Sequence, residues 1–569
     1  IISTSSNLVP GDRVDGGDGS DTFEVIHTGL ATIPSTANLI SIENISIQDT
    51  VHQSLDFSTL TTITGIELDS GTTVDGATIN TTLGDGQSLK LDSITDGDTA
   101  AASLADGGIK ISLPNSMTAL DLTIDDIGPA TASTNENVFI DIAGANVANL
   151  NITSANDSFV VLENSGASIS TINIEGSGTL SLIGALPNSI TTINGGTSST
   201  NFTVSTGTAD ATITGGSGND VIVLGGGNNN VNSGNGSDTI TLSTGNDTVN
   251  TSSGSDTVTA SSGTNNITTG ASDDQITLTG GSNTVNSGAS NDQLTISGGT
   301  NNIDTESGND QITISGGTNT LVTGNDNDTI SASNGSNNIN TGSGSDQVTL
   351  TGGTNTVVTG NNDDTINVSG GNNDIDTDSG SDQVVLTGGT NDVNTGANDD
   401  TVTLSGGTET VDMGSGNDTV VAGANLSAAD TVNGGDGTGD TLEITSALTD
   451  ALTARLSNFE ILEIKGGGGL THDVTGLAGL TSLKTSGALT GAIVITDLAE
   501  AAEVDISAAL GNDLTINQVN SAGGSDTLTF DFSGSSFTTG GSVIAPNIET
   551  VTLKTSDSGA KTMSGGTFA

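Results

Sequence analysis

An 18-residue repeat occupies the centre of this 569-residue chain. Twelve aspartates recur at that interval without a slip, and an aliphatic residue stands two positions after each of them. The aspartates are Asp220, Asp238, Asp256, Asp274, Asp292, Asp310, Asp328, Asp346, Asp364, Asp382, Asp400 and Asp418. A short, fixed period is the sequence signature of a solenoid, so this repeat limits the fold more than any other feature of the chain.

Each 18-residue repeat contains two similar halves of nine residues. In the stretch GSGSDQVTLTGGTNTVVTG (342–360), Asp346 follows one glycine turn and Asn355 holds the matching place after the next. Asparagine fills this second position in most repeats, while Asp247 and Glu409 replace it near the two ends. Nine residues suit one short strand and one tight turn, so two halves form one flattened coil. The pattern predicts an all-β fold, a parallel β-roll or β-solenoid with 18-residue coils, aliphatic side chains inside, and Thr and Gln outside.

Stacked coils would place the aspartates in one column. Neighbouring carboxylates would lie about 5 Å apart, the spacing of paired strands, and would repel by about 3 kcal/mol per pair at an effective dielectric constant near 20. The chain has no Lys or Arg between Lys110 and Arg455, so the compensating cation must come from solution. Carboxylates and backbone carbonyls without Cys or His favour Ca²⁺. The asparagine column needs no metal, because amides stack into a hydrogen-bonded ladder.

Two stretches carry a family resemblance. GGSGNDVIV (215–223) and GGDGSDTFE (16–24) are similar to the calcium-binding RTX nonapeptide, in which glycine turns precede an aspartate. The resemblance implies a parallel β-roll with several Ca²⁺ ions in its turns, held by aspartate carboxylates and turn carbonyls. The implied metal ligands are the twelve aspartates of the column together with Asp21, Asp440 and Asp526.

The repeat also departs from the RTX pattern. Asp326, Asn362 and Asn398 replace the second turn glycine in alternate coils, which gives a 36-residue super-period. Calcium sites in those coils are expected to differ, with Asp363 and Asp399 as candidate extra ligands.

The flanks are less regular, and the sequence predicts three domains. Residues 1–205 form an irregular β-solenoid with one RTX-like turn, 206–425 form the β-roll of twelve coils, and 426–569 form a β-rich domain with a short helix within 445–456. One motif recurs three times in the flanks, an Asp-Thr-apolar strand followed about twenty residues later by a glutamate within a second strand. These glutamates, Glu43, Glu460 and Glu549, are interpreted as structural ladder residues in preference to calcium ligands.

Composition excludes several functions. The chain has 67 acidic and 8 basic residues, so it lacks the basic surface that nucleic acid requires. No apolar run approaches the ~20 residues of a membrane span, which argues against membrane insertion. There is no cysteine nucleophile, and the three histidines form no zinc-protease motif. Tyr and Trp are absent and there are only 10 Phe, which leaves almost no aromatic platform for a glycosidase. We therefore expect that the chain is not an enzyme, although an enzyme domain outside this sequence remains open.

RTX turns beside a threonine-rich solenoid resemble the calcium-dependent surface-layer (S-layer) proteins of Gram-negative bacteria, such as those of Caulobacter and Campylobacter. This resemblance implies type I secretion, an extracellular location at the cell surface, and self-assembly into a homo-oligomeric lattice that needs Ca²⁺. A cell-surface polysaccharide is a further expected partner, through a region outside this sequence.

Two alternative functions stay open. One is a calcium-stiffened adhesin or stalk segment. The other is an ice-binding module, because threonines such as Thr241, Thr259 and Thr277 form an outward column. Ser331, Asn367 and Val385 break that column, which weakens the ice-binding interpretation.

Overall fold

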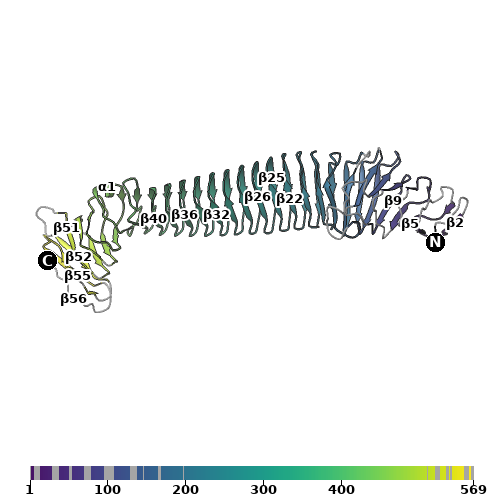
Figure 1. The fold of residues 1–569 in the computed structure, drawn as a ribbon. Helices are drawn as coiled ribbons and strands as arrows, with labels where there is room; N and C mark the ends of the chain where they lie inside the picture. Colours follow the sequence, from purple (N-terminus) through teal and green to yellow (C-terminus); the bar gives the residue numbers. More distant parts are fainter. Residues whose placement is uncertain are drawn as a thin grey trace. The chain divides into compact units, whose positions relative to one another are not determined.

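In the computed structural model, the chain is all-β and its strands pair in parallel (Figure 1). The structure describes residues 2–4, 13–27, 38–49, 54–69, 78–94, 108–128, 138–144, 146–163, 168–196, 198–487, 489–500, 502–508, 510–519, 526–533, 537–538, 541–546, 548–555 and 563–564. They fall into two compact units, Ile1–Gln293 and Leu294–Ala569. Each unit is a β-solenoid, which confirms the predicted fold class. The predicted three-domain division rests on sequence regularity and stays a prediction.

The first unit is built from two parallel sheets that the chain enters alternately. The first sheet contains β1 (Ile2–Thr4), β3 (Thr22–His27), β5 (Asn44–Asp49), β7 (Gly65–Asp69), β9 (Ser88–Asp92), β11 (Ala119–Asp125), β13 (Asn149–Ser154), β15 (Thr171–Gly176), β17 (Thr192–Asn194), β19 (Thr212–Gly216), β21 (Asn230–Gly234), β23 (Thr248–Asn250), β25 (Thr264–Thr268) and β27 (Ser282–Asn286). The second sheet contains β6 (Ser54–Asp56), β8 (Thr78–Thr82), β10 (Gly108–Ser112), β12 (Val138–Ala143), β14 (Ser158–Glu163), β16 (Leu180–Ala185), β18 (Phe202–Ser205), β20 (Val221–Val223), β22 (Thr239–Leu242), β24 (Thr257–Ala260) and β26 (Gln275–Leu278). A separate pair joins β2 (Arg13–Asp15) to β4 (Asn38–Ile40).

The strands of the second unit also alternate between two sheets, and β28 (Gln293–Ile296) begins at the division. The first sheet contains β29 (Thr300–Asp304), β31 (Thr318–Val322), β33 (Ser336–Asn340), β35 (Thr354–Val358), β37 (Asn372–Asp376), β39 (Thr390–Asn394), β41 (Thr408–Asp412), β43 (Thr431–Asn433) and β45 (Leu456–Ser457). The second contains β30 (Gln311–Ile314), β32 (Thr329–Ala332), β34 (Gln347–Leu350), β36 (Thr365–Val368), β38 (Gln383–Leu386), β40 (Thr401–Leu404), β42 (Thr419–Gly423), β44 (Thr441–Ile444), β46 (Ile461–Ile464), β48 (Ser482–Thr485), β50 (Glu503–Ile506), β52 (Thr527–Asp531) and β55 (Thr550–Lys554).

The C-terminal part of this unit adds smaller elements. They are β47 (Leu470–Asp473), β49 (Ile493–Leu498), β51 (Leu514–Gln518) and β54 (Val543–Ile544) in one sheet, the pair β53 (Phe537–Thr538) and β56 (Met563–Ser564), and the helix α1 (Asp450–Thr453). The helix confirms the short helix expected within 445–456. Among the described residues, no helix has the length and apolar character needed to cross a membrane.

Strand register confirms the 18-residue coil. Val348 of β34 pairs with Ile366 of β36, and Asn355 of β35 pairs with Asn373 of β37. In the flanks the offset varies: Asp121 pairs with Asn151, 30 residues later. The regular coils therefore need a strict sequence period, whereas the flanks absorb longer connections.

The interior of each regular coil is thin and aliphatic. Val348 and Leu350 are fully buried, as is Val357 in the facing sheet. Gln347 and Thr356 are exposed because adjacent side chains on a strand point to opposite faces. The inward aliphatic and outward polar placement is therefore confirmed.

The turns stack tightly. A Cβ at Gly344, which has φ of 148°, would lie 1.9 Å from the carbonyl oxygen of Asp326 in the preceding coil. Asp326, Asn362 and Asn398 stand where other coils have this glycine, and their φ values are 77°, 80° and 84°. Asp and Asn tolerate this left-handed conformation better than other residues with a Cβ. The substituted coils thus keep a left-handed turn.

Candidate metal centres

The aspartate column forms a ladder of backbone-to-carboxylate hydrogen bonds. Each of these residues lies in the turn before a strand, and the N–H of one donates to Oδ1 of the aspartate in the next coil. In the first unit the bonds link Asp220, Asp238, Asp256, Asp274 and Asp292 at 2.7–2.9 Å. In the second unit they link Asp310, Asp328, Asp346, Asp364, Asp382, Asp400, Asp418 and Asp440 at 2.7–2.9 Å. The predicted columns therefore exist within each unit, and that of the second unit extends to Asp440.

The second carboxylate oxygen of most of these aspartates is buried without a partner. The side chains are 0–1% exposed, and Oδ2 has no hydrogen-bond donor among the described residues. This holds for Asp220, Asp238, Asp256, Asp274, Asp328, Asp346, Asp364, Asp382, Asp400, Asp418 and Asp440. An uncompensated buried carboxylate is costly, so these oxygens require a cation or a proton.

Burial dominates the electrostatics of the column. The pKa of Asp328, Asp364 and Asp400 is raised to about 7. Burial is the largest cause, the charges of neighbouring aspartates add to it, and hydrogen bonds act against it. The repulsion expected from the sequence is therefore present, but loss of hydration is the larger effect. Bound Ca²⁺ would compensate the charge of these oxygens in place of the water that burial removes.

A column of buried threonines accompanies the aspartates. Thr305, Thr323, Thr341, Thr359, Thr377 and Thr395 stand five residues before successive aspartates and are fully buried. Thr323 Oγ1 donates to the carbonyl of Thr341 at 3.3 Å, and Thr377 Oγ1 to that of Thr395 at 2.8 Å. This column was not predicted from the sequence, although the 18-residue spacing of its threonines could have revealed it. Every hydroxyl of the six except that of Thr359 donates to a carbonyl of the next coil, which helps to fix the turn backbone.

Asp363 and Asp399 belong to a second, outer ladder. Oδ1 of Asp363 accepts the N–H of Ser381, and Oδ1 of Asp399 accepts that of Asn417, both at 2.8 Å. Asn327 does the same for Ser345 at 2.6 Å. The structure thus gives both aspartates a turn-stabilising role, and their role as extra ligands stays a prediction.

The opposite edge of the coils is an amide ladder. Nδ2 of Asn337, Asn355 and Asn373 donates to Oδ1 of the asparagine in the next coil at 2.7 Å. The same nitrogen donates to the carbonyl three residues earlier, such as that of Gly352 from Asn355 at 3.1 Å. Each buried amide thus supplies both a donor and an acceptor, which confirms the predicted amide ladder.

Glu409 ends the amide ladder of the second unit. Its Oε2 accepts from Asn391 at 2.7 Å, while Oε1 is buried and has no partner in the described part of the chain. The backbone N–H of Glu409 donates to Asp430 at 3.1 Å. Burial raises the pKa of Glu409 to about 7, and the charge of Asp430 adds to the shift. A carboxylate can accept a hydrogen bond from the last amide, but it has no proton with which to donate one to the next coil.

The residues present fit Ca²⁺ by donor type. The orphaned oxygens belong to hard carboxylate ligands, and the stacked turns bring backbone carbonyls against them, as at Gly215, where a Cβ would lie 1.8 Å from Ser233 O and 2.6 Å from Asp220 Oδ2. No group of three or more His, Cys, Asp or Glu side chains able to hold a metal occurs among the described residues. Ions in this column would therefore depend on carbonyls as well as on one carboxylate per coil.

The three flanking glutamates take the ladder role expected for them. Glu43, Glu460 and Glu549 accept the N–H of Asp21, Asp440 and Asp526 through Oε2, at 2.9, 3.1 and 2.9 Å. In the flanks, each glutamate therefore accepts the aspartate N–H that the aspartate of the next coil accepts in the regular column. Of the three histidines, His472 is fully buried away from these ladders and His52 lies outside the described residues.

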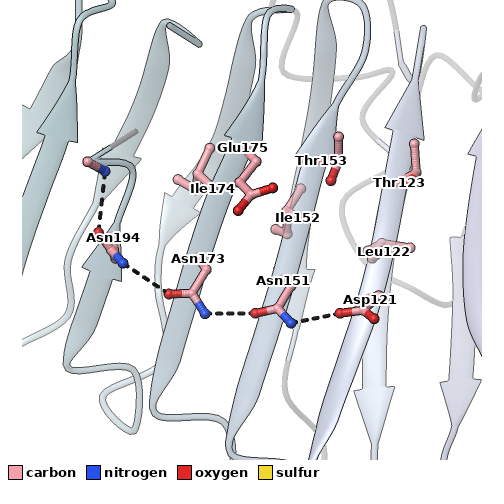
Figure 2. A pocket seen from close by; sticks show the side chains of 11 residues that line it. Asp121, Leu122, Thr123, Asn151, Ile152, Thr153, Asn173, Ile174, Glu175 and Asn194 are labelled. Carbon is pink, nitrogen blue, oxygen red and sulfur yellow. Dashed lines mark hydrogen bonds between the residues drawn. The ribbon is translucent and has the colours of Figure 1, made fainter. Parts of the chain in front are cut away.

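A groove of about 430 Å³ lies on the outer face of β11, β13, β15 and β17, apart from the aspartate column. Figure 2 shows an exposed amide ladder along it, in which Asn173 Nδ2 donates to Asn151 and Asn151 Nδ2 donates to Asp121, both at 2.7 Å. This ladder too ends on a carboxylate. The groove is therefore a second instance of the amide-ladder chemistry and not a part of the metal centres.

The fold and these ladders define a parallel β-solenoid whose turns present buried carboxylates. A family model for the RTX calcium-binding nonapeptide repeat matches residues 205–240, 241–276, 259–294, 277–312, 313–348, 350–384 and 386–420. This central part of the chain is therefore an array of RTX calcium-binding repeats, which confirms the predicted RTX β-roll. No curated protein matches the chain.

The family match identifies the cofactor and the general role. RTX repeats bind Ca²⁺ at multiple sites, so the cofactor of the array is calcium, as predicted. Such repeats are structural units, and they indicate a secreted, extracellular calcium-binding protein.

Proposed function

We propose that this chain is a structural subunit of a calcium-dependent bacterial surface layer. It is secreted by a type I system and assembles with copies of itself outside the cell. The observation that carries the proposal is the column of buried carboxylate oxygens without partners, because such a column, where it is not protonated, folds stably only when cations are abundant. Calcium is scarce in the cytosol and abundant outside, so folding is confined to the place where the lattice forms.

The metal ligands in this proposal are the aspartates predicted from the sequence. Oδ2 of each column aspartate binds an ion between coils, together with carbonyls of the stacked turns, while Oδ1 keeps its backbone hydrogen bond. Since the unfolded chain has no preformed site, binding free energy becomes folding free energy. Dissociation constants near 10⁻⁴–10⁻³ M, typical of extracellular calcium modules, would suit this use.

Electron microscopy of the purified full chain before and after calcium addition tests the proposal. We expect two-dimensional sheets in millimolar calcium and none after chelation. Separate particles that fold in calcium but never associate would reject the surface-layer role and favour the adhesin or stalk alternative. Sheets that form equally well in chelator would reject the calcium-dependent mechanism.

A further inference from the structure

Three Asp–Glu pairs outside the matched repeats share one local geometry. In each pair the aspartate begins an Asp-Thr-apolar strand, and its N–H donates to a glutamate carried by the following coil. The pairs are Asp21 with Glu43, Asp440 with Glu460, and Asp526 with Glu549. Their spacings of 22, 20 and 23 residues differ from the 18 of the regular coils, so they are not copies of the nonapeptide register.

Each pair leaves one aspartate oxygen buried and unpaired. Oδ2 of Asp21, Oδ2 of Asp440 and Oδ1 of Asp526 have no donor among the described residues. Asp440 is fully buried and Asp526 is 5% exposed. The glutamate brings a second carboxylate to the same place, since Oε2 of Glu460 lies 3.1 Å from the backbone nitrogen of Asp440. Two carboxylates thus lie at the same turn. The glutamate accepts one N–H hydrogen bond there, and one oxygen of the aspartate accepts none.

The surroundings of Asp440 supply oxygen atoms, and no lysine or arginine among the described residues forms an ion pair with it. A Cβ at Gly437 would lie 2.6 Å from both carboxylate oxygens of Asp440 and 2.2 Å from the Gly416 carbonyl oxygen. Within the described part of this unit, the lysine ion pairs join Lys465 to Glu443 and Glu463, and Lys554 to Glu503. Hard oxygen donors of this kind select a divalent cation such as Ca²⁺.

We propose that Asp440 and Glu460 together bind one divalent cation, and that Asp21–Glu43 and Asp526–Glu549 are two further copies of this two-carboxylate site. The glutamate then has two roles, since it holds the aspartate N–H through one oxygen and the cation through its carboxylate charge. The inference rests on the proposed calcium-dependent folding and extends it from the regular array into both flanks.

The test compares wild type with Glu460→Gln in the full chain. Glutamine keeps an oxygen that accepts the Asp440 N–H but removes the charge. Hydrogen–deuterium exchange is followed in peptides covering 434–465 and 340–390 during a Ca²⁺ titration. We expect Glu460→Gln to raise the calcium midpoint of protection at least tenfold in 434–465 and to leave it unchanged in 340–390. Glu175→Gln, at an exposed position on β15, is the control and should change neither.

The outcomes separate this inference from the proposed function. An unchanged midpoint in 434–465, with normal calcium response in 340–390, would overturn the two-carboxylate site alone. If Glu460→Gln raised protection without calcium and left the midpoint unchanged, the pair would share a proton instead of a cation. Lack of calcium response in 340–390 of the wild type would reject the proposed function itself. Glu43→Gln and Glu549→Gln repeat the test at the other copies if Glu460→Gln folds poorly.

Discussion

The two edges of the regular coils differ by one functional group, and that difference separates a metal-dependent edge from a self-sufficient one. Asp346 and Asn355 occupy equivalent turn positions, and both side chains are 1% exposed. The amide of Asn355 donates twice and accepts once. The carboxylate of Asp346 accepts the N–H of Asp328 and leaves its other oxygen unpaired. A stack of amides satisfies itself, because each member carries donors and acceptors, whereas a stack of carboxylates has only acceptors.

Calcium removal is the strongest test of the difference between the aspartate edge and the asparagine edge. At pH 8, chelation should remove most of the β-sheet circular dichroism signal of the full chain, because each site at 100 times its dissociation constant contributes about 2.7 kcal/mol and many sites act together. Re-addition of Ca²⁺ should restore the signal, and equal Mg²⁺ should not. A spectrum that is insensitive to chelation would show that the aspartate edge, like the asparagine edge, needs no metal.

The effect of Asp346→Asn on the free energy of unfolding should change sign when calcium is added. Without calcium the substitution removes a buried charge and raises the free energy of unfolding. With saturating calcium it removes a ligand from adjacent sites and lowers that free energy by about 2–3 kcal/mol. Denaturant unfolding measures the effect in saturating calcium, and the fraction of chain that is folded by circular dichroism in chelator measures the effect without it. Destabilisation in both conditions would mean that Asp346 acts through its hydrogen bond alone.

Asn355→Ala is the matched change on the other edge. It leaves the Asn337 amide and the Asn373 carbonyl oxygen without their partners, so it should cost about 1–3 kcal/mol. Denaturant unfolding in saturating calcium measures this loss, and calcium stoichiometry by isothermal titration should stay unchanged. A reduced stoichiometry would place metal on the amide edge and remove the contrast between the edges.

The pH dependence sharpens the contrast in the metal-free chain. Burial raises the pKa of Asp256, Asp328 and Asp364 to about 7, so the folded state binds more protons than the unfolded state between about pH 4 and pH 7. Stability from these groups is therefore full below about pH 4 and is lost as pH rises through 7. Thermal melting in chelator should show a falling Tm over this range, and saturating calcium should abolish the fall. A Tm that rises with pH in chelator would contradict the burial of the column.

The smallest expected effect concerns the end of the amide ladder. Glu409→Gln supplies a donor at the position where the buried Oε1 has no partner, so it should stabilise the chain at pH 8 by about 1 kcal/mol. The gain should disappear near pH 5, where Glu409 itself is protonated. Denaturant unfolding at the two pH values measures it. Destabilisation at pH 8 would instead indicate that Glu409 holds a cation with Asp430.

Much of the fold could be read from the sequence because a strict period leaves one register. The 18-residue spacing of Asp346 and Asp364, with Val348 and Ile366 two residues after them, fixes which coils pair and which side chains face inward. The flanks were predicted less fully, since variable connections such as the 30 residues between Asp121 and Asn151 carry no period. The buried column that includes Thr323 and Thr341 had a visible period but no charge to draw attention to its role.

The sequence by itself determined that carboxylates form one edge of each coil, that amides form the other, and that no lysine or arginine is available to neutralise the carboxylates. The tertiary structure alone decided how each group is used. It turned one oxygen of Asp328 toward no donor while the other accepts the N–H of Asp310, and it placed Glu460 over Asp440 across a coil boundary. The physical reason is that a repeat period specifies position along the chain, whereas the need for a cation depends on which oxygens burial leaves without a donor.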